Sequence, residues 1–417
     1  MKSALQKTPL ALGSQVLSTA QNLVLSTTCA VVSTPAEYGA WGIGFAFFLA
    51  TQSVTRASFS TPQLLSAGSG NELESPTERG FPVTASILTG LLIGCLTLIL
   101  AVPGLLGALS LPLIAFSATL APTLAHDALR FTSIATSSYG KLLALDAWRI
   151  FIQVGLTLLI FTLGNPSTFT LTLIWGAGAA FPSAYLIITR QVRLGITESI
   201  RHYGEMAGDS IKMGAEAAIG TLGANGVQVA VGVALGLEAA GYFRAGLTAM
   251  GLINIFVSSL LPLLTKSMRE RTLESKPLTP PVLHWSLTMA GLTFAYCAAI
   301  WALPPQAGES LLGDSWRGFR GALAAFFLQA ALRGPFTFVP VALRALSQFN
   351  EALWLRVETS ITQILIPYFL ALALGFNGAV WGYALAALVN SLQAFRYLRP
   401  RGPNSESPAI TTPHDND

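Results

Sequence analysis

Long apolar runs separated by short polar segments make up most of this chain. About twelve runs approach the roughly 20 residues that an α-helix needs to cross the hydrocarbon core of a bilayer. Turn-forming residues separate the closest runs, at Pro103-Gly104, Gly164-Asn165-Pro166 and Gly375-Phe376-Asn377-Gly378. The pattern predicts an all-α polytopic membrane protein with spans at 10–32, 38–58, 82–103, 106–127, 142–163, 168–189, 211–234, 240–264, 283–303, 319–343, 354–374 and 376–396.

The composition strengthens the prediction of a lipid environment. Of the 417 residues, 52% are hydrophobic and 11% are charged, whereas soluble domains carry roughly 25% charged residues. The three cysteines lie singly in apolar runs, without the spacing of a disulfide framework or a zinc site. We therefore expect no metal and no cofactor, and the basic residues form no stretch typical of a nucleic-acid surface.

The positive charges give the spans an orientation. Of the 24 lysines and arginines, 20 lie at the two termini or at every second loop of this map. Because an excess of Lys and Arg marks cytoplasmic loops, both termini are predicted to be cytoplasmic, which requires an even number of spans. The segment 190–210 is predicted to lie along the membrane interface, and the polar segment 401–417 is predicted to be a disordered tail.

Two parts of the chain resemble each other. Residues Gly13 to Gly39 lead through the first span into a helix that starts near Glu37, and Gly214 to Gly241 do the same through the seventh span. Shorter echoes pair Ala128-Leu129-Arg130 with Ala331-Leu332-Arg333, and Trp148-Arg149 with Trp354-Leu355-Arg356. A repeat predicts two lobes of six helices, residues 1–200 and 201–400, with substrate between them near the midplane. Chance similarity among Gly- and Ala-rich helices is the alternative.

These segments resemble the multidrug/oligosaccharidyl-lipid/polysaccharide (MOP) transporter superfamily. The residues that carry the resemblance begin the second helix of each half, at Glu37-Tyr38-Gly39 and Gly241-Tyr242-Phe243. Three segments in the first half resemble the polysaccharide-exporter branch, which includes the Wzx-type O-antigen flippases: Asp127-Ala128-Leu129-Arg130-Phe131, Tyr139-Gly140-Lys141 and Asp146-Ala147-Trp148-Arg149.

The resemblance implies a function. It implies a flippase in the bacterial cytoplasmic membrane that turns an undecaprenyl-pyrophosphate-linked oligosaccharide to the outer leaflet by alternating access. The implied partners are this lipid-linked glycan, membrane lipids and the proteins of glycan polymerisation or assembly. A cation-coupled multidrug antiporter of the same fold is the alternative.

Polar residues form stripes along two predicted spans. In the first span, Gln15, Ser18, Asn22 and Ser26 share one helical face, and in the fifth span Asp146, Arg149, Gln153 and Thr157 do so. Polar groups in hydrocarbon are costly and usually face protein or a watery cavity. The stripes predict that Gln15, Asn22, Arg149 and Gln153 line a substrate cavity, and hydrogen bonding between helices is the alternative.

Two arginines are further candidates for binding a diphosphate. Arg333 falls in the middle of the tenth span with no acid nearby in sequence, so it is expected to face the cavity or another helix. Its guanidinium suits a diphosphate because it donates in a bidentate fork. Arg130 has Asp127 three residues earlier on the same helical face, so it is either a second cavity residue or half of a local ion pair.

Glu216 is the candidate for ion coupling. It lies about one turn inside the seventh span, four residues after Lys212. A desolvated carboxyl binds a proton more readily, so Glu216 is either the coupling site or an interfacial partner of Lys212. Glu37 and Glu238 are predicted to complement helix dipoles, and Pro340 is predicted to kink the tenth span.

A membrane-embedded glycosyltransferase is a rival function of another class. Such an enzyme needs acidic residues on a sizeable loop outside the cytoplasm. The predicted outer loops are short, and 304–318 carries the acids Glu309 and Asp314. The sequence therefore favours a transporter over an enzyme.

Overall fold

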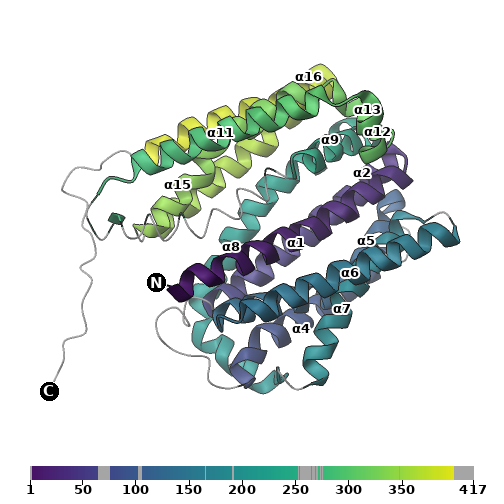
Figure 1. Cartoon of the computed structure of the whole chain (residues 1–417). Helices are drawn as coiled ribbons and strands as arrows, with labels where there is room; N and C mark the ends of the chain where they lie inside the picture. Colours follow the sequence, from purple (N-terminus) through teal and green to yellow (C-terminus); the bar gives the residue numbers. More distant parts are fainter. Residues whose placement is uncertain are drawn as a thin grey trace.

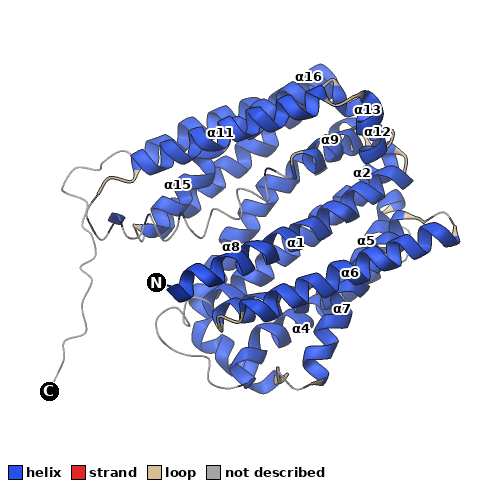
Figure 2. Ribbon diagram, in the orientation of Figure 1, coloured by secondary structure: helices blue, strands red, loops and turns tan. Residues whose placement is uncertain are grey.

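The computed structural model describes the chain in several stretches. They are residues 2–63, 76–101, 106–164, 166–189, 192–251, 276–346 and 348–398, together with 253, 264, 268, 271, 272 and 274. All regular structure in these residues is helical, with no strand among them (Figure 2). The predicted all-α class is confirmed. The predicted tail and part of the predicted eighth span lie outside the described residues.

The first half of the chain contains six long helices. They are α1 (Lys2–Val32), α2 (Pro35–Thr55), α4 (Pro76–Ala101), α5 (Ser110–Ala135), α6 (Tyr139–Leu163) and α7 (Thr168–Ile188). A π-helical turn, η1 (Arg56–Ser60), extends α2, and a 3-10 turn, η2 (Gly107–Leu109), precedes α5. We call α1 to α7 the N-terminal half.

The remaining helices form the C-terminal half. They are α8 (Ile196–Leu235), α9 (Leu237–Ala249), α11 (Thr279–Ala302), α12 (Pro305–Leu312), α13 (Ser315–Arg320), α14 (Leu323–Leu332), α15 (Gly334–Ala345) and α16 (Phe349–Tyr397). By length and composition, eight described segments could cross a membrane, with α14 and α15 joined and α16 counted once. Figure 1 shows α1 beginning and α16 ending at one end of the bundle, the terminal end, and α12 and α13 at the other.

The element α16 is a hairpin of two helices. Its backbone turns at Gly375, where φ is 66° and ψ is −151°. A non-glycine residue is strained at such a positive φ. Past the turn the two helices run antiparallel, and a Cβ on Gly378 would come within 2.0 Å of the carbonyl oxygen of Leu370. The hairpin predicted at Gly375 is therefore confirmed, and α16 accounts for two predicted spans.

The structure adds detail to two local predictions. Residues from Ile196 onward continue the seventh span as one helix of 40 residues. At a rise of about 1.5 Å per residue, this helix is longer than the hydrocarbon core is thick, so its first part extends beyond the span. In the tenth span the chain breaks between α14 and α15 at Arg333, while α15 runs on through Pro340. Pro335 explains the break, because a proline fits only the first turn of a helix.

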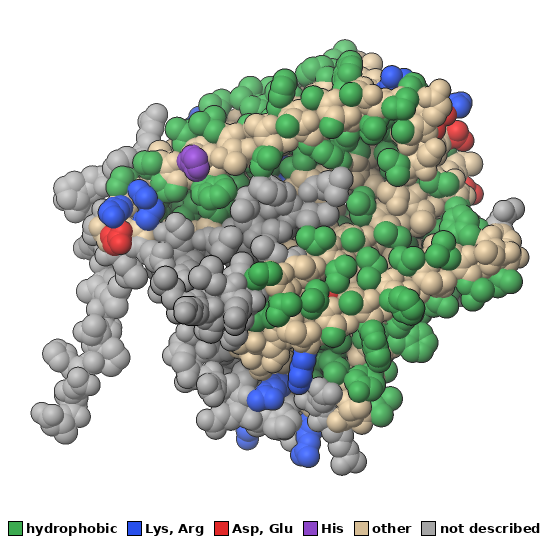
Figure 3. Space-filling view, viewed as in Figure 1, with side chains coloured by type: hydrophobic (Ala, Val, Ile, Leu, Met, Phe, Trp, Pro, Cys, Tyr) green, Lys and Arg blue, Asp and Glu red, His purple; other side chains and the backbone are tan. Residues whose placement is uncertain are grey.

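The surface of the bundle is suited to lipid. Phe151, Ile188 and Phe294 expose 78%, 78% and 77% of their area, which would be costly in water. On the face drawn in Figure 3, hydrophobic side chains cover the middle of the bundle, and the visible charges gather near its ends. This distribution matches a protein whose middle lies in a bilayer.

The halves meet at a crossing of two glycines. The main contacts between the halves run from α2 to α8 and α9. A Cβ on Gly39 would lie 1.9 Å from the carbonyl oxygen of Leu237, and one on Gly241 would lie 1.8 Å from that of Pro35. These are the glycines that close the repeat found in the sequence. Their contact fixes α2 against α9 next to α13.

Candidate functional site

A buried carboxylate ties three helices of the N-terminal half together. Asp146 on α6 is fully buried and accepts hydrogen bonds from Ser14 Oγ of α1 at 2.5 Å and Arg130 Nε of α5 at 3.0 Å. Its backbone oxygen also accepts from Gln21 Nε2 at 3.1 Å. Because a buried charge needs a partner, Arg130 and Asp146 neutralise each other inside the half.

The local pair predicted between Asp127 and Arg130 is present as a long ion pair, and each residue has a closer partner on another element. Arg56 of η1 donates to both oxygens of Asp127, at 2.8 Å from Nε and 2.7 Å from Nη2. Arg130 lies 3.9 Å from Asp127, because its guanidinium turns to Asp146. A bidentate pair is the stronger arrangement, so Arg56 is the main partner of Asp127.

Arg149 is a buried cation without a carboxylate partner. It is 5% exposed, and its guanidinium lies 5.0 Å from the ring centre of Trp175 on α7. No acid of the described residues comes within 4 Å of it, and its Nε has no hydrogen-bond partner there. Gln153, one turn further, donates to the backbone oxygen of Gln21 at 3.0 Å. Both side chains therefore lie between helices in this conformation.

His126 is a polar residue of this cluster that the sequence reading missed. It is fully buried on α5, and its Nε2 lies 3.8 Å from Asp146 Oδ1. Neither ring nitrogen has a hydrogen-bond partner among the described residues. Its position one helical turn before Arg130 indicates that the two side chains share a face of α5.

The predicted stripe on α1 lies apart from this cluster. Gln15 and Asn22 are partly exposed, whereas their neighbours Ser14 and Gln21 are buried against α6. The last residue of the stripe, Ser26, is buried and accepts a hydrogen bond from Arg244 of the other half. Gln15 and Asn22 thus keep side chains that a substrate could reach.

In the C-terminal half, neither Arg333 nor Arg356 has a carboxylate partner among the described residues. Arg333 sits at the break between α14 and α15, partly exposed, and its Nε has no partner among the described residues. Arg356 on α16 is also partly exposed, with no ion pair in the described part of the chain. Glu216 is nearby but bonds to Arg344 of α15 and not to Lys212.

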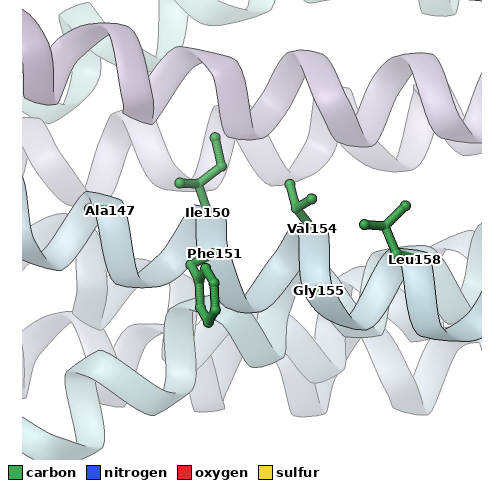
Figure 4. Close-up of a pocket in the computed structure, with 6 residues that line it drawn as sticks. All are labelled: Ala147, Ile150, Phe151, Val154, Gly155 and Leu158. Atoms are coloured by element: carbon green, nitrogen blue, oxygen red, sulfur yellow. The ribbon is translucent and has the colours of Figure 1, made fainter.

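A groove on α6 is apolar throughout. It has a volume of about 430 Å³ and follows one face of the helix. Figure 4 labels the residues that line it: Ala147, Ile150, Phe151, Val154, Gly155 and Leu158. With no polar group to fix a headgroup or a sugar, the groove suits an acyl chain and is not our candidate site.

Comparison with known proteins identifies solved structures that share this fold. No model of a known protein family and no curated protein sequence matches the chain. An inward-facing multidrug resistance MATE family transporter of the MOP superfamily superposes with a TM-score of 0.68 and 14% identity, over 92% of this chain and 93% of that one. An outward-facing MATE family transporter gives 0.63 and 14%, over 94% of each.

A third solved structure widens the comparison. A MOP superfamily transporter from Pyrococcus furiosus, described as having a binding pocket of reverse polarity that suggests a different function, gives a TM-score of 0.62. Its identity is 14%, over 94% of each chain. The chain therefore has the polytopic, all-helical fold of these transporters, and identities this low show the fold alone.

Proposed function

We propose that the protein flips an undecaprenyl-pyrophosphate-linked oligosaccharide across a bacterial cytoplasmic membrane by alternating access, with both termini cytoplasmic. The observation that carries the proposal is Arg333, a cation at a helix break in mid-span with no carboxylate partner in the described structure. An unpaired charge at membrane depth marks a functional site. Its fork of donors fits a diphosphate.

The remaining predicted residues take graded roles in this proposal. Gln15 and Asn22, partly exposed on α1, are assigned to the sugar hydroxyls. Arg149 is a second phosphate ligand, which the cargo would meet once α6 and α7 separate around it. Arg130 bonds to Asp146 and Gln153 bonds to Gln21. In the proposal these two residues line the cavity and also stabilise the packing of its wall.

Glu216 is proposed as the coupling site. Its carboxylate joins α8 to α15 through Arg344. Protonation would remove the charge that holds this pair and free Arg344. Replacing Glu216 with Gln is expected to abolish gradient-driven transport while expression persists. Unchanged transport in that variant would remove Glu216 from the mechanism.

Multidrug export is the second candidate, and the fold of the solved MATE transporters favours it. A site for cationic drugs needs acids that are free to pair with them. Here Asp127 is engaged by Arg56 and Asp146 by Arg130. Arg333 and Arg356, which form no ion pair among the described residues, therefore favour an anionic cargo.

The third candidate, a glycosyltransferase, depends on Glu309 and Asp314. Arg317 Nε donates to Glu309 Oε1 at 3.0 Å, and this hydrogen bond lowers the pKa of the Glu309 carboxyl. A carboxyl that is held ionised is a poor general acid at neutral pH. The pair is also largely exposed, outside the predicted spans, which favours a structural role.

The decisive experiment uses proteoliposomes that contain the purified full-length chain. Lipid-linked oligosaccharide is placed in both leaflets, and digestion by an added glycosidase beyond the outer-leaflet half reports flipping. Charge-assisted hydrogen bonds contribute about 1.5–3 kcal/mol, so Arg333→Gln is expected to slow flipping about ten- to a hundredfold. Arg317→Gln is the matched control and should behave as wild type.

Drug export is measured in the same vesicles with a cationic dye and an imposed ion gradient. Dye transport without flipping would overturn the proposal in favour of the antiporter. Flipping that is equal in the wild type and in Arg333→Gln would remove Arg333 from the site.

A further inference from the structure

Arg244 reaches from one half of the protein into the other. It lies on α9, yet its guanidinium is 4.6 Å from the ring centre of Phe45 and 5.4 Å from that of Trp41, both on α2. Its Nη2 donates to Ser26 Oγ of α1 at 3.2 Å. The side chain is 6% exposed. A charge of the C-terminal half is therefore seated in an aromatic cage of the N-terminal half.

The cage compensates this charge only in part. No carboxylate of the described residues lies within ion-pair distance of Arg244, and its Nε has no hydrogen-bond partner among them. A buried charge without full compensation is costly. Aromatic faces attract the guanidinium most strongly when water is excluded. The contact is thus favourable while it stays closed, and hydration of the guanidinium favours opening.

Other contacts place Arg244 at the joint between the halves. One turn before it, Gly241 is in backbone contact with Pro35, and one turn after it, Thr248 Oγ1 lies 2.9 Å from the hydroxyl of Tyr38. Gly42 of α2 leaves the space for its aliphatic part, because a Cβ there would lie 3.0 Å from Arg244 Cδ. The arginine is therefore the charged centre of an otherwise close-packed contact between α2 and α9.

We propose that Arg244 is a releasable pin between the two halves near the α12–α13 end. Its seating on Trp41 and Phe45 holds α9 against α2, and its rehydration offsets only part of the contacts that are lost when the halves separate. The pin rests on the proposed function only in requiring that the halves move apart. It makes no demand on the identity of the cargo.

The chain carries a natural reporter for this joint. Cys29 lies on α1, three residues beyond Ser26, and is fully buried. Cys95 and Cys297 are replaced by Ser and Ala, which leaves Cys29 as the single thiol. Its rate of modification by a membrane-impermeant maleimide then reports opening of the joint. Because Arg244 also acts electrostatically on this thiol, Phe45→Leu, which leaves Arg244 in place, separates opening from that direct effect. The measurement needs no substrate, so its outcome is independent of the flipping assay.

The test compares two replacements of the pin in full-length protein in nanodiscs. Arg244→Met keeps most of the volume and loses the charge, and it is expected to raise the Cys29 modification rate about tenfold or more, since two cation–π contacts are lost. Arg244→Lys keeps the charge without the planar fork, so an intermediate rate is expected. Arg317→Met is the control and should match the parent.

A Met variant that is modified at the parent rate would overturn the proposal, because packing alone would then close the joint. If Arg244→Met does not yield folded protein, Phe45→Leu removes one wall of the cage and leaves the arginine in place. That variant is expected to raise the rate in the same direction. A parent-like rate in Phe45→Leu would equally overturn the pin.

Discussion

In the N-terminal half, Arg130 lies three residues after Asp127, and Arg149 lies three residues after Asp146. The echo in the C-terminal half keeps both arginines, as Arg333 and Arg356. At the positions that correspond to the two acids it has Ala330 and Leu353. Both acids of the first half are engaged, Asp127 by Arg56 and Asp146 by Arg130, whereas Arg333 and Arg356 form no ion pair in the described residues.

This difference separates a structural use of arginine from a functional one. A buried arginine with a well-placed carboxylate locks helices together, as Arg130 and Asp146 lock α5 to α6. An arginine without a carboxylate partner has its positive charge and its N–H donors available to bind a mobile anion. In the proposed function, Arg130 therefore holds the shape of the N-terminal half, whereas Arg333, together with Arg149, binds the charged part of the cargo.

The largest effect is expected from breaking the lock in the N-terminal half. Replacing Asp146 with Asn leaves Arg130 buried with only the 3.9 Å contact to Asp127, and removing one partner of a buried pair costs about 3–5 kcal/mol. Thermal unfolding in detergent should show a large drop in midpoint temperature. Asp314→Asn removes an acid at the α12–α13 end, outside the spans, and serves as the control.

A double variant checks the cause of that loss. In Arg130→Gln with Asp146→Asn, both members are neutral, so much of the lost stability should return. If the double variant is less stable than Asp146→Asn alone, the uncompensated charge is not the cause, and the contrast between the halves would lose its basis.

The second effect is expected from giving the C-terminal half its missing acid. Ala330→Asp places a carboxylate three residues before Arg333, as Asp127 stands before Arg130. Neutralising Arg333 should weaken binding of undecaprenyl diphosphate about ten- to a hundredfold, because charge-assisted hydrogen bonds are worth about 1.5–3 kcal/mol. Fluorescence titration with the diphosphate measures this. Ala330→Asn has the same shape without the charge and overpacks the same buried site, so weaker binding in Ala330→Asp than in Ala330→Asn isolates the effect of the charge.

Several features of the fold were readable from local sequence. The turn residues that begin at Gly375 predicted a hairpin. The backbone there has a positive φ, which glycine adopts without strain. Glu37 was expected to begin a helix, and it forms a capping box with Thr34. The repeat led to Gly39 and Gly241, which touch. Each of these depends on a few consecutive residues or on a pattern along one helix.

The side-chain partners were not readable in the same way. Arg56 pairs with Asp127 across 71 residues, and Arg244 reaches Ser26 across 218. Local reasoning therefore chose Asp127 for Arg130 and Lys212 for Glu216, and in both cases a residue of another helix is the better partner. Charge positions follow from sequence, whereas pairing depends on how helices pack.

The third effect concerns the two corresponding glycines, Gly39 and Gly241, at which the halves are alike. Gly39→Ala and Gly241→Ala each place a methyl group within 2 Å of a backbone oxygen of the other helix, and overpacking of this kind costs about 1–3 kcal/mol. Both should lower the unfolding midpoint by similar amounts. Gly155→Ala, with open space around it, is the control. Unequal losses at the two glycines would show that the crossing is less symmetric than the repeat.

The smallest effect is expected from Arg333→Leu, and its sign matters more than its size. If Arg333 is a cation kept for a ligand, the empty protein bears the cost of its partial desolvation, and Leu removes that cost. The variant should be as stable as the wild type or more stable by up to about 1 kcal/mol, a modest gain because the side chain is only partly buried. The measurement is thermal unfolding without lipid-linked glycan, beside Asp146→Asn. A loss comparable to that of Asp146→Asn would mean that Arg333 has a structural partner after all, and the two halves would then use arginine in the same way.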